Sequence, residues 1–416
     1  MEKQKVSNNF GKHGWLVVIL FGVVLFLTSA LTADGTNIII PTLAEKLSLD
    51  PNAMLAAVGV AGWIGTAGAF VLAWLSQVLG PKKVILASMI ITALSYLCYA
   101  FIQGMTGWWV CTILINIFAY GISFCGYSAV IANWFPTKKG MVMGWATIGN
   151  NMASAVFIPI FAVLLGGGVN MPFYGYFIFM VIILVLIAII VKNTPEEAGK
   201  LPDNEEASVE IVKAMQEEMA NYKSPWTLKR ILTDKDIWCA GIGYGLMFTC
   251  TVGLIVQFVN RAAAFGFAQG QAAALLSVAA VIGIVASLLW GVLDTKKGTK
   301  LASILLAIWF AVALIFFAMP FKGTFLVGVI LTGCALGGNT NFSTSMCASL
   351  FGRKNFQRAF NFMFPLGGIF KSAAPMVLAV VVAKTGRLEV AYILFAIGAV
   401  IAAILFGCIN MTPKEE

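Results

Sequence analysis

Two charged residues inside long apolar stretches are the strongest candidates for chemistry. Lys371 lies in the apolar run 360–382, thirteen positions after Arg358 and thirteen before Lys384. At about 1.5 Å per residue, its ammonium is about 20 Å from either charged end, which is too far for a lysine side chain to reach water. Because a charge in lipid is costly, Lys371 is expected to face a polar cavity or a partner. Its functional interpretation is an anion site; its structural interpretation is a lysine held by carbonyl groups of a helix bundle.

The second charge is Asp34, in the segment SALTADGTNIIIP, 22 positions after Lys12. That distance predicts a place in the outer third of the membrane, within reach of a cavity mouth. Burial favours the protonated form of a carboxyl group, so Asp34 is a candidate carrier of a coupled proton. Two alternatives remain open: an ion pair with Lys371 when the anion site is empty, and a water-exposed acid where Gly35 ends the helix.

The composition predicts a multi-spanning membrane protein. The chain has 416 residues, 60% of them hydrophobic and 11% charged, and its mean hydropathy is +0.91. These values lie far outside the range of soluble domains. The net charge of +9 comes from short basic clusters between apolar runs, so no nucleic-acid partner is expected.

Enzymatic, metal and cofactor chemistry have little support in the sequence. The eight cysteines lie singly in apolar segments, and His13 is the only histidine, so neither a metal cluster nor a Ser/His/Asp triad can be assembled. No GxxxxGK[ST] motif is present, which excludes that route to ATP as an energy source. We therefore expect no catalytic residue, no cofactor and no enzyme.

At about 20 apolar residues per crossing, the chain divides into twelve predicted spans. They are expected near residues 15–41, 53–79, 83–103, 107–133, 141–166, 172–191, 237–259, 269–293, 301–320, 324–350, 358–383 and 389–410. The corresponding division of the chain is a leader (1–14), a six-helix bundle (15–191), a central loop (192–236), a second six-helix bundle (237–410) and a tail (411–416).

Basic residues indicate how these spans are oriented. Of the 27 lysines and arginines, 21 fall on the side that carries both termini and the central loop, five fall on the other side, and Lys371 lies within a span. The positive-inside rule then places both termini and the central loop in the cytoplasm. The plasma membrane is the expected location of the protein. Within the loop, EEASVEIVKAMQEEMANY has helix-like apolar spacing and is expected to form a surface helix, as a tether or a regulatory element.

The two halves of the chain echo each other. Phe135 and Phe351 are 216 positions apart, as are Pro159 and Pro375, and the junction glycines Gly80 and Gly298 are 218 apart. These offsets favour an all-α membrane fold of two pseudo-symmetric six-helix halves facing one another across a cavity. That arrangement is typical of alternating-access carriers.

Several motifs resemble the major facilitator superfamily (the MFS fold), and in particular its oxalate/formate antiporter and monocarboxylate transporter branch. The segment ANWFPTKKGMVMGW is similar to the WFPxKRGxAxG signature of that branch, and the segments NRAAAFGFAQGQAAALLS and SPWTLKRILTDKDIW also resemble it. The resemblance implies transport of small organic anions with protons or by exchange, and a carboxylate held by a lysine of helix eleven and an arginine of helix eight. The chain departs from this pattern because Ser287 stands where the arginine would be, and a single lysine favours a monoanion.

Other polar residues within the spans are candidates for hydrogen bonds to a substrate, or equally to a neighbouring helix. Helices one, four, seven and ten line the cavity in the superfamily that the chain resembles. The substrate-binding candidates besides Lys371 are Tyr120, Tyr127, Asn150, Tyr244, Asn339, Asn341 and Asn361. Asn37 and Asn116 are further amides within spans.

The sequence therefore predicts a secondary active transporter, a monomer, that moves a small organic anion with protons or a counter-anion. The first alternative is a carrier of neutral or cationic solutes in which Asp34 binds substrate and Lys371 is structural. The second is a membrane sensor that transports nothing, which would need an appended signalling domain; the central loop is too short for one.

Overall fold

The computed structural model describes residues 10–135, 142, 145–198, 202–204 and 224–414. Over these residues the chain is helical, and no strand occurs. Eleven of the described helices are long and apolar enough to cross a membrane. The expectation of an all-α, multi-pass membrane protein is confirmed.

In the first half of the chain, three crossings contain a short π-helical segment. In chain order the elements are α1 (Gly11–Ser29), η1 (Ala30–Asp34), α2 (Thr36–Leu47), α3 (Pro51–Leu79), α4 (Pro81–Cys98), α5 (Met105–Tyr120), η2 (Gly121–Tyr127), α6 (Ser128–Trp134), α8 (Ile148–Met152), η3 (Ala153–Phe157), α9 (Ile158–Leu165) and α10 (Met171–Ile190). The π turns η1, η2 and η3 interrupt the first, fourth and fifth crossings. Such turns are frequent at functional sites.

The second half follows the central connection, whose described elements are η4 (Glu196–Ala198), η5 (Pro202–Asn204) and α12 (Leu228–Thr233). Its membrane elements are α13 (Lys235–Ile255), α14 (Phe258–Ala263), α15 (Gln269–Lys297), α16 (Thr299–Ala318), α17 (Lys322–Leu336), α18 (Asn339–Thr385) and α19 (Leu388–Gly407). The tenth crossing comprises α17 and the first part of α18, and the eleventh is the remainder of α18 after a kink at Gly352. The surface helix expected in the central loop lies outside the described residues.

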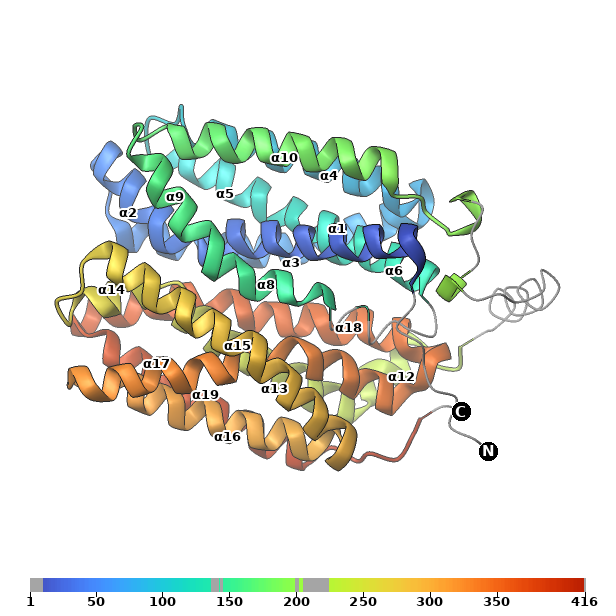
Figure 1. Ribbon diagram of the computed structural model, residues 1–416. Helices are drawn as coiled ribbons and strands as arrows, with labels where there is room; N and C mark the ends of the chain where they lie inside the picture. Colours follow the sequence, from blue (N-terminus) through green and yellow to red (C-terminus); the bar gives the residue numbers. More distant parts are fainter. Residues whose placement is uncertain (1–9, 136–141, 143–144, 199–201, 205–223, 415–416) are drawn as a thin grey trace.

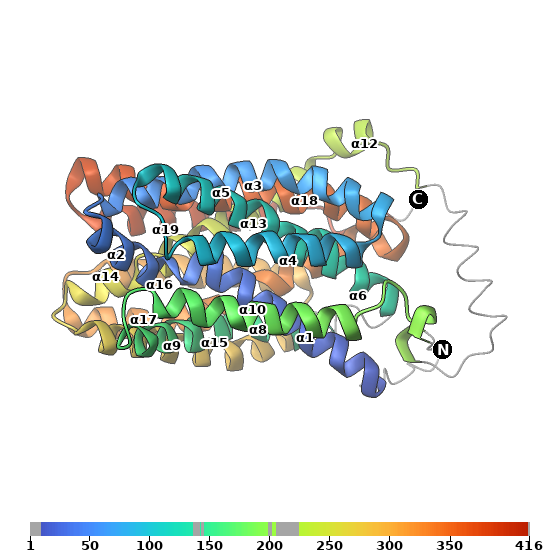
Figure 2. The ribbon, with the colours of Figure 1, turned by 90° about the horizontal axis from the view of Figure 1, so that it is seen from above.

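The helices run roughly along one common axis, in two bundles that lie side by side (Figures 1 and 2). Elements α1 to α10 form one bundle, and α13 to α19 form the other. Helix α1 begins, and α19 ends, at the same end of the molecule, which we call the termini end. The other end is called the opposite end. The two halves expected from the sequence are therefore present.

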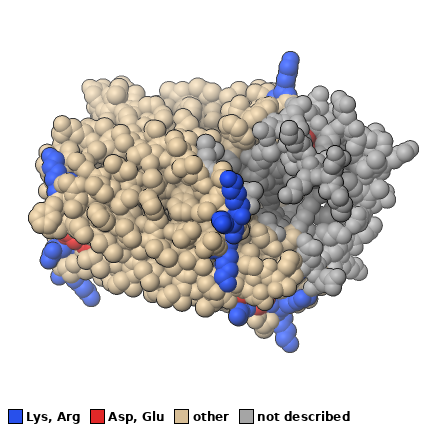
Figure 3. All heavy atoms as spheres, turned by 60° about the horizontal axis from the view of Figure 1, so that its bottom comes forward, with Lys and Arg blue, Asp and Glu red and all other residues tan. Residues whose placement is uncertain are grey.

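One face of the molecule has a broad uncharged area, which lies between charged residues at one edge and a strip of lysine and arginine nearer the middle of the view (Figure 3). Helices α16 and α19 expose apolar side chains along their length. These include Ile308, Val312, Ile315, Ile397, Val400 and Ile404. An exposed apolar band is what a lipid-facing surface requires.

The repeat between the halves extends to backbone conformation at one pair of junctions. Gly80 joins α3 to α4 with φ +89°, and Gly298 joins α15 to α16 with φ +86°. Residues with a Cβ rarely adopt this region, so glycine is needed at both turns. The sequence echo at these positions thus has a shared structural cause.

Candidate functional site

Lys371 lies at the centre of the eleventh crossing, on the part of α18 that packs against α3. Its neighbours on the helix make this contact: the carbonyl of Ile369 accepts a hydrogen bond from Trp63 Nε1 at 2.8 Å, and a Cβ at Gly62 would lie 2.6 Å from Ser372 Oγ. Lys371 itself is half-buried. Within the described part of the chain, no hydrogen bond or ion pair reaches its ammonium.

The face of α18 that carries Lys371 is approached by hydroxyl groups of the first half. A Cβ at Gly368 would lie 3.2 Å from Thr66 Oγ1 and 3.3 Å from Tyr120 Oη, and these two oxygens are 3.3 Å apart. Residues three apart on a helix share a face, so Gly368 and Lys371 are neighbours there. The missing side chain at Gly368 lets the Tyr120 hydroxyl approach the helix about one turn from the lysine.

Asn339 supplies a polar group from the tenth crossing. It begins α18 directly after the break at Gly337 and Gly338, and its Nδ2 lies 3.4 Å from Thr251 Oγ1 of α13. The side chain is buried, and among the described residues its Oδ1 has no hydrogen-bond partner. A buried carbonyl oxygen in this condition favours a ligand or water that donates a hydrogen bond.

Contacts between α13 and α18 relate the depths of these groups. Thr249 Oγ1 donates to the carbonyl of Phe370 at 2.7 Å, which places Thr249 beside the residue before Lys371. Thr251 lies two residues farther along α13, about 3 Å. The Asn339–Thr251 contact and Lys371 are therefore at nearly the same depth in the membrane.

Asp34 lies in η1 with a side chain that is 1% exposed, and its Oδ2 accepts a hydrogen bond from Ser29 Oγ at 2.7 Å. Gly35 does not end the helix, because α2 continues from Thr36. A water-exposed acid at a helix end was one open alternative, and it is wrong. The helix continues through the π turn, which holds the carboxyl group inside the bundle.

The two intramembrane charges are not joined by an ion pair in the described structure. The amide of Asn37, three residues after Asp34, bonds the carbonyl of Ile255 on α13. Ile255 lies six residues beyond Thr249, so Asp34 is about one helical turn nearer the opposite end than Lys371. The two groups are therefore close in depth while belonging to different halves.

Other residues predicted for the site lie elsewhere. Tyr127 is fully buried, stacks on Phe21 and donates to the carbonyl of Val17 at 3.3 Å, all within the first half. Tyr244 is buried in the second half, with its hydroxyl 2.6 Å from Ser303 Oγ.

Three predicted amides remain. Asn150 is half-buried on α8. The side chains of Asn341 and Asn361 lie outside the described part of the structure.

Toward the termini end, the two halves meet through phenylalanine rings. Phe124 of η2 stacks on Phe364 of α18, with ring centroids 4.5 Å apart and planes within 8° of parallel. The ring centroids of Phe360 and Phe248 lie 5.3 Å and 6.3 Å from that of Phe364. All four rings are half-buried. We call Phe124, Phe248, Phe360 and Phe364 the aromatic cluster; its central ring, Phe364, lies about two turns before Lys371 on α18.

An ion pair between a buried arginine and a half-buried glutamate, at the opposite end, was missed from the sequence. Arg261 is 3% exposed, and its Nη1 lies 2.5 Å from a carboxylate oxygen of Glu389. Its guanidinium also donates to the carbonyls of Phe317, Ala318 and Met319, at the C-terminal end of α16. It therefore ties α14 to α16 and α19. The sequence placed Arg261 in a loop, and no local signal distinguishes it from a solvated arginine.

No cluster of three or more potential metal ligands occurs in the part of the chain that the structure describes. The arrangement around Lys371 instead combines one cation, one tyrosine hydroxyl and one carboxamide at neighbouring depths. Such a set can hold a small anion by charge and orient it by hydrogen bonds.

Comparisons with known proteins agree with this architecture. The family model described as "Major Facilitator Superfamily" matches residues 19–302. Monocarboxylate transporter 13 of Rattus norvegicus is 25% identical over 156 residues, a region that spans 37% of this chain and only 36% of the relative.

A crystal structure of a point mutant of the nucleoside transporter NupG superposes with a TM-score of 0.65 at 17% identity, covering 94% of this chain and 99% of that one. That likeness concerns the fold, which matches along nearly the whole of both chains. The family match covers more than half of the sequence, and together with the all-α multi-pass fold it identifies the chain as a member of the Major Facilitator Superfamily.

Proposed function

We propose that this transporter moves a small organic anion by alternating access, and that Lys371 binds the anionic group. The observation that carries the proposal is a half-buried lysine at the middle of a membrane span, whose ammonium has no hydrogen bond or ion pair to any described residue. Keeping a charge there is costly, and an anionic ligand offsets that cost directly. A lysine needed only for structure would be expected to have a protein partner.

Neighbouring groups narrow the ligand class. Tyr120 can donate or accept a hydrogen bond one turn from Lys371, and the unpartnered Oδ1 of Asn339 favours a donor. A single cation suits a single carboxylate, and a donor elsewhere on the ligand, such as a hydroxyl, suits Asn339. We therefore propose a monocarboxylate-type solute. The similarity to monocarboxylate transporter 13 supports the same class.

Asp34 is proposed to carry the coupled proton. Its carboxyl group is buried within about one turn in depth of Lys371 and belongs to the other half. A protonated Asp34 would be neutral while the access of the site changes from one side of the membrane to the other, which avoids the cost of a second buried charge. Exchange of the substrate for another anion would use Lys371 alone.

The proposed orientation places the termini end in the cytoplasm and the protein in the plasma membrane. The spans predicted from the sequence assign 21 basic residues to the side that carries the termini and five to the other side, and the positive-inside rule relates this bias to topology. We propose that the monomer is the transporting unit, because each chain carries both halves.

A thermal-shift screen of the purified full-length protein tests the substrate class. Each small carboxylate is compared with its uncharged amide, for example lactate with lactamide, so that shape is held nearly constant while charge is removed. We expect carboxylates to raise the melting temperature and the amides to have no effect, because only the charged form bonds Lys371. Stabilisation by amines or neutral solutes alone would favour the rival carrier in which Asp34 binds substrate.

A further inference from the structure

The seventh crossing is broken near the opposite end, between α13 and α14. Helix α13 ends at Ile255, and α14 starts at Phe258 after Gln257, whose φ of −122° is not helical. In an unbroken helix, the amide of Val259 would donate to the carbonyl of Ile255, because these residues are four apart. At the break, this hydrogen bond is not made between the two residues themselves.

The side chain of Asn37 occupies the place of that missing bond. Its Nδ2 donates to the carbonyl of Ile255, and its Oδ1 accepts from the amide of Val259 at 3.3 Å. The carboxamide thus contacts both members of a single interrupted i to i+4 pair. Asn37 belongs to α2 of the first half and is 2% exposed, so this contact joins the two halves inside the protein.

A peptide group is the chemical equivalent of a carboxamide, with one donor and one acceptor. Inserting Asn37 therefore keeps both backbone groups of the break satisfied, which a membrane interior requires. If the halves separate at this end, Asn37 withdraws and leaves the Val259 amide and the Ile255 carbonyl facing each other. They can then bond directly and restore a continuous helix.

We propose that Asn37 is the gate residue of the opposite end, and that opening this end rejoins the seventh helix. The seventh helix then has two states, in both of which the Ile255 carbonyl and the Val259 amide are hydrogen-bonded: broken and bonded to Asn37 when the halves are closed, and continuous when they are apart. A contact with two discrete, hydrogen-bonded arrangements can act as a two-state switch. The proposal rests on the alternating-access part of the proposed function and is independent of the solute.

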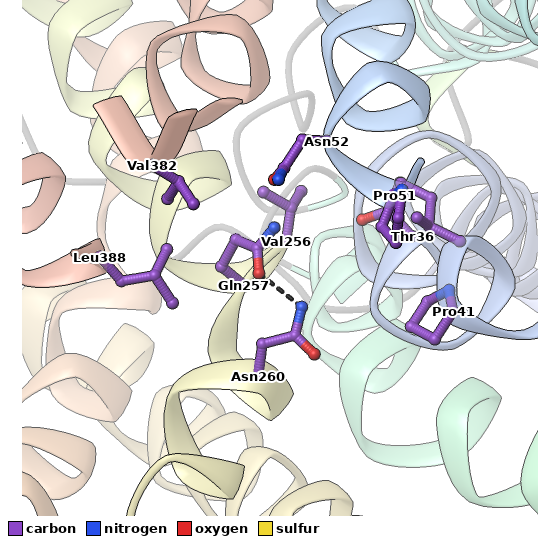
Figure 4. Close-up of a pocket in the computed structure, with 10 residues that line it drawn as sticks. Thr36, Pro41, Pro51, Asn52, Val256, Gln257, Asn260, Val382 and Leu388 are labelled. Carbon is purple, nitrogen blue, oxygen red and sulfur yellow. Dashed lines mark hydrogen bonds between the residues drawn. The ribbon is translucent and has the colours of Figure 1, made fainter. Parts of the chain in front are cut away.

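The surroundings of Asn37 fit a gate that separates. A pocket of about 210 Å³ lies at the same end, between Thr36 and Ile40 of the first half and Gln257, Asn260 and Val382 of the second (Figure 4). Gln257 and Asn260 bond each other across one turn at 2.6 Å. Because its walls come from both halves, the pocket would widen as they part.

The test measures distances between the halves by pulsed electron resonance in lipid nanodiscs, with spin labels at the exposed positions Glu45 and Gln271. Asn37→Ala removes both hydrogen bonds to the second half, together with the bond from Nδ2 to the carbonyl of Asp34 in its own half. Asn37→Asp removes the donor while keeping the shape. The matched control is Asn116→Ala, because Asn116 is also a buried amide, and its Nδ2 bonds the carbonyl of Thr112 within its own helix. Hydrogen exchange of the Val259 amide is followed in the same variants.

We expect Asn37→Ala to raise the ratio of open to closed populations at this end on the order of tenfold, with a smaller rise for Asn37→Asp and none for Asn116→Ala. The Val259 amide should stay protected in Asn37→Ala because the helix rejoins. Distances unchanged in both Asn37 variants would overturn the gate. Rapid exchange at Val259 together with a shifted distance would overturn the rejoining alone. Neither readout involves a solute, so failure of the gate proposal can be told apart from failure of the anion proposal.

Discussion

Toward the two ends of their interface, the halves contact each other through different chemistry. At the opposite end a single carboxamide, Asn37, bonds two backbone groups of the other half and is fully buried. At the termini end the aromatic cluster joins the halves through half-buried rings, with Phe124 stacked on Phe364. Hydrogen bonds require one geometry, whereas stacked rings tolerate sliding. The comparison suggests an all-or-none closure at one end and a graded one at the other.

The largest expected effect is at Asp34, which lies one helical turn before Asn37. Asp34→Asn should abolish uptake driven by a pH gradient and leave exchange of substrate between the two sides intact, since a carboxamide cannot carry the proton. The measurement is uptake into proteoliposomes with and without the gradient, alongside counterflow. Equal loss of both activities would instead assign Asp34 to binding or folding.

A smaller effect is expected at the aromatic closure. Phe364→Ala removes the stack on Phe124, which is worth about 0.5–1.5 kcal/mol beyond area burial, so the termini end should open more often by roughly two- to tenfold. Spin labels on the exposed termini-end residues Val78 and Lys229 report this. Phe101→Ala, at an exposed ring, is the matched control and should change nothing. An unchanged distance distribution in Phe364→Ala would mean that the cluster does not close this end.

The smallest net change is expected when both closures are weakened together. Asn37→Ala favours opening at one end and Phe364→Ala at the other, so the double variant should have a ratio of the two open forms nearer to the wild type than either single variant. Distance distributions at both ends, measured on the same samples, check this. If both ends open at once in the double variant, the two closures do not alternate.

Much of this architecture was predictable from sequence, because membrane spans follow from apolar length and polarity. The crossings, the two halves and the isolated charge at Lys371 all come from local patterns. The shared backbone of Gly80 and Gly298 also appears in the sequence, as glycines at equivalent junctions.

What sequence could not supply is the register between helices from different halves. Asn37 was visible as an amide within a span, but its partners are backbone groups more than 200 residues away, which leave no side-chain signature. The approach of Tyr120 to Gly368 has the same origin. The ion pair of Arg261 and Glu389 depends in the same way on how helices pack, but within the second half. Tyr127 and Tyr244 are likewise tyrosines within predicted spans, and the sequence does not tell which groups they contact. In the structure, each hydroxyl finds its hydrogen-bond partner within its own half.

The central claim is that the Lys371 ammonium binds the substrate anion, and calorimetric titration of a stabilising carboxylate into purified variants tests it most directly. A charge-assisted hydrogen bond is worth about 1.5–3 kcal/mol, so Lys371→Ala should weaken binding roughly ten- to a hundredfold. Lys371→Ala should remain folded, because it removes a charge that no described residue pairs, and Lys371→Arg should bind partially. The exposed control Lys384→Ala should bind as the wild type does. Unchanged affinity in a folded Lys371→Ala would contradict the account.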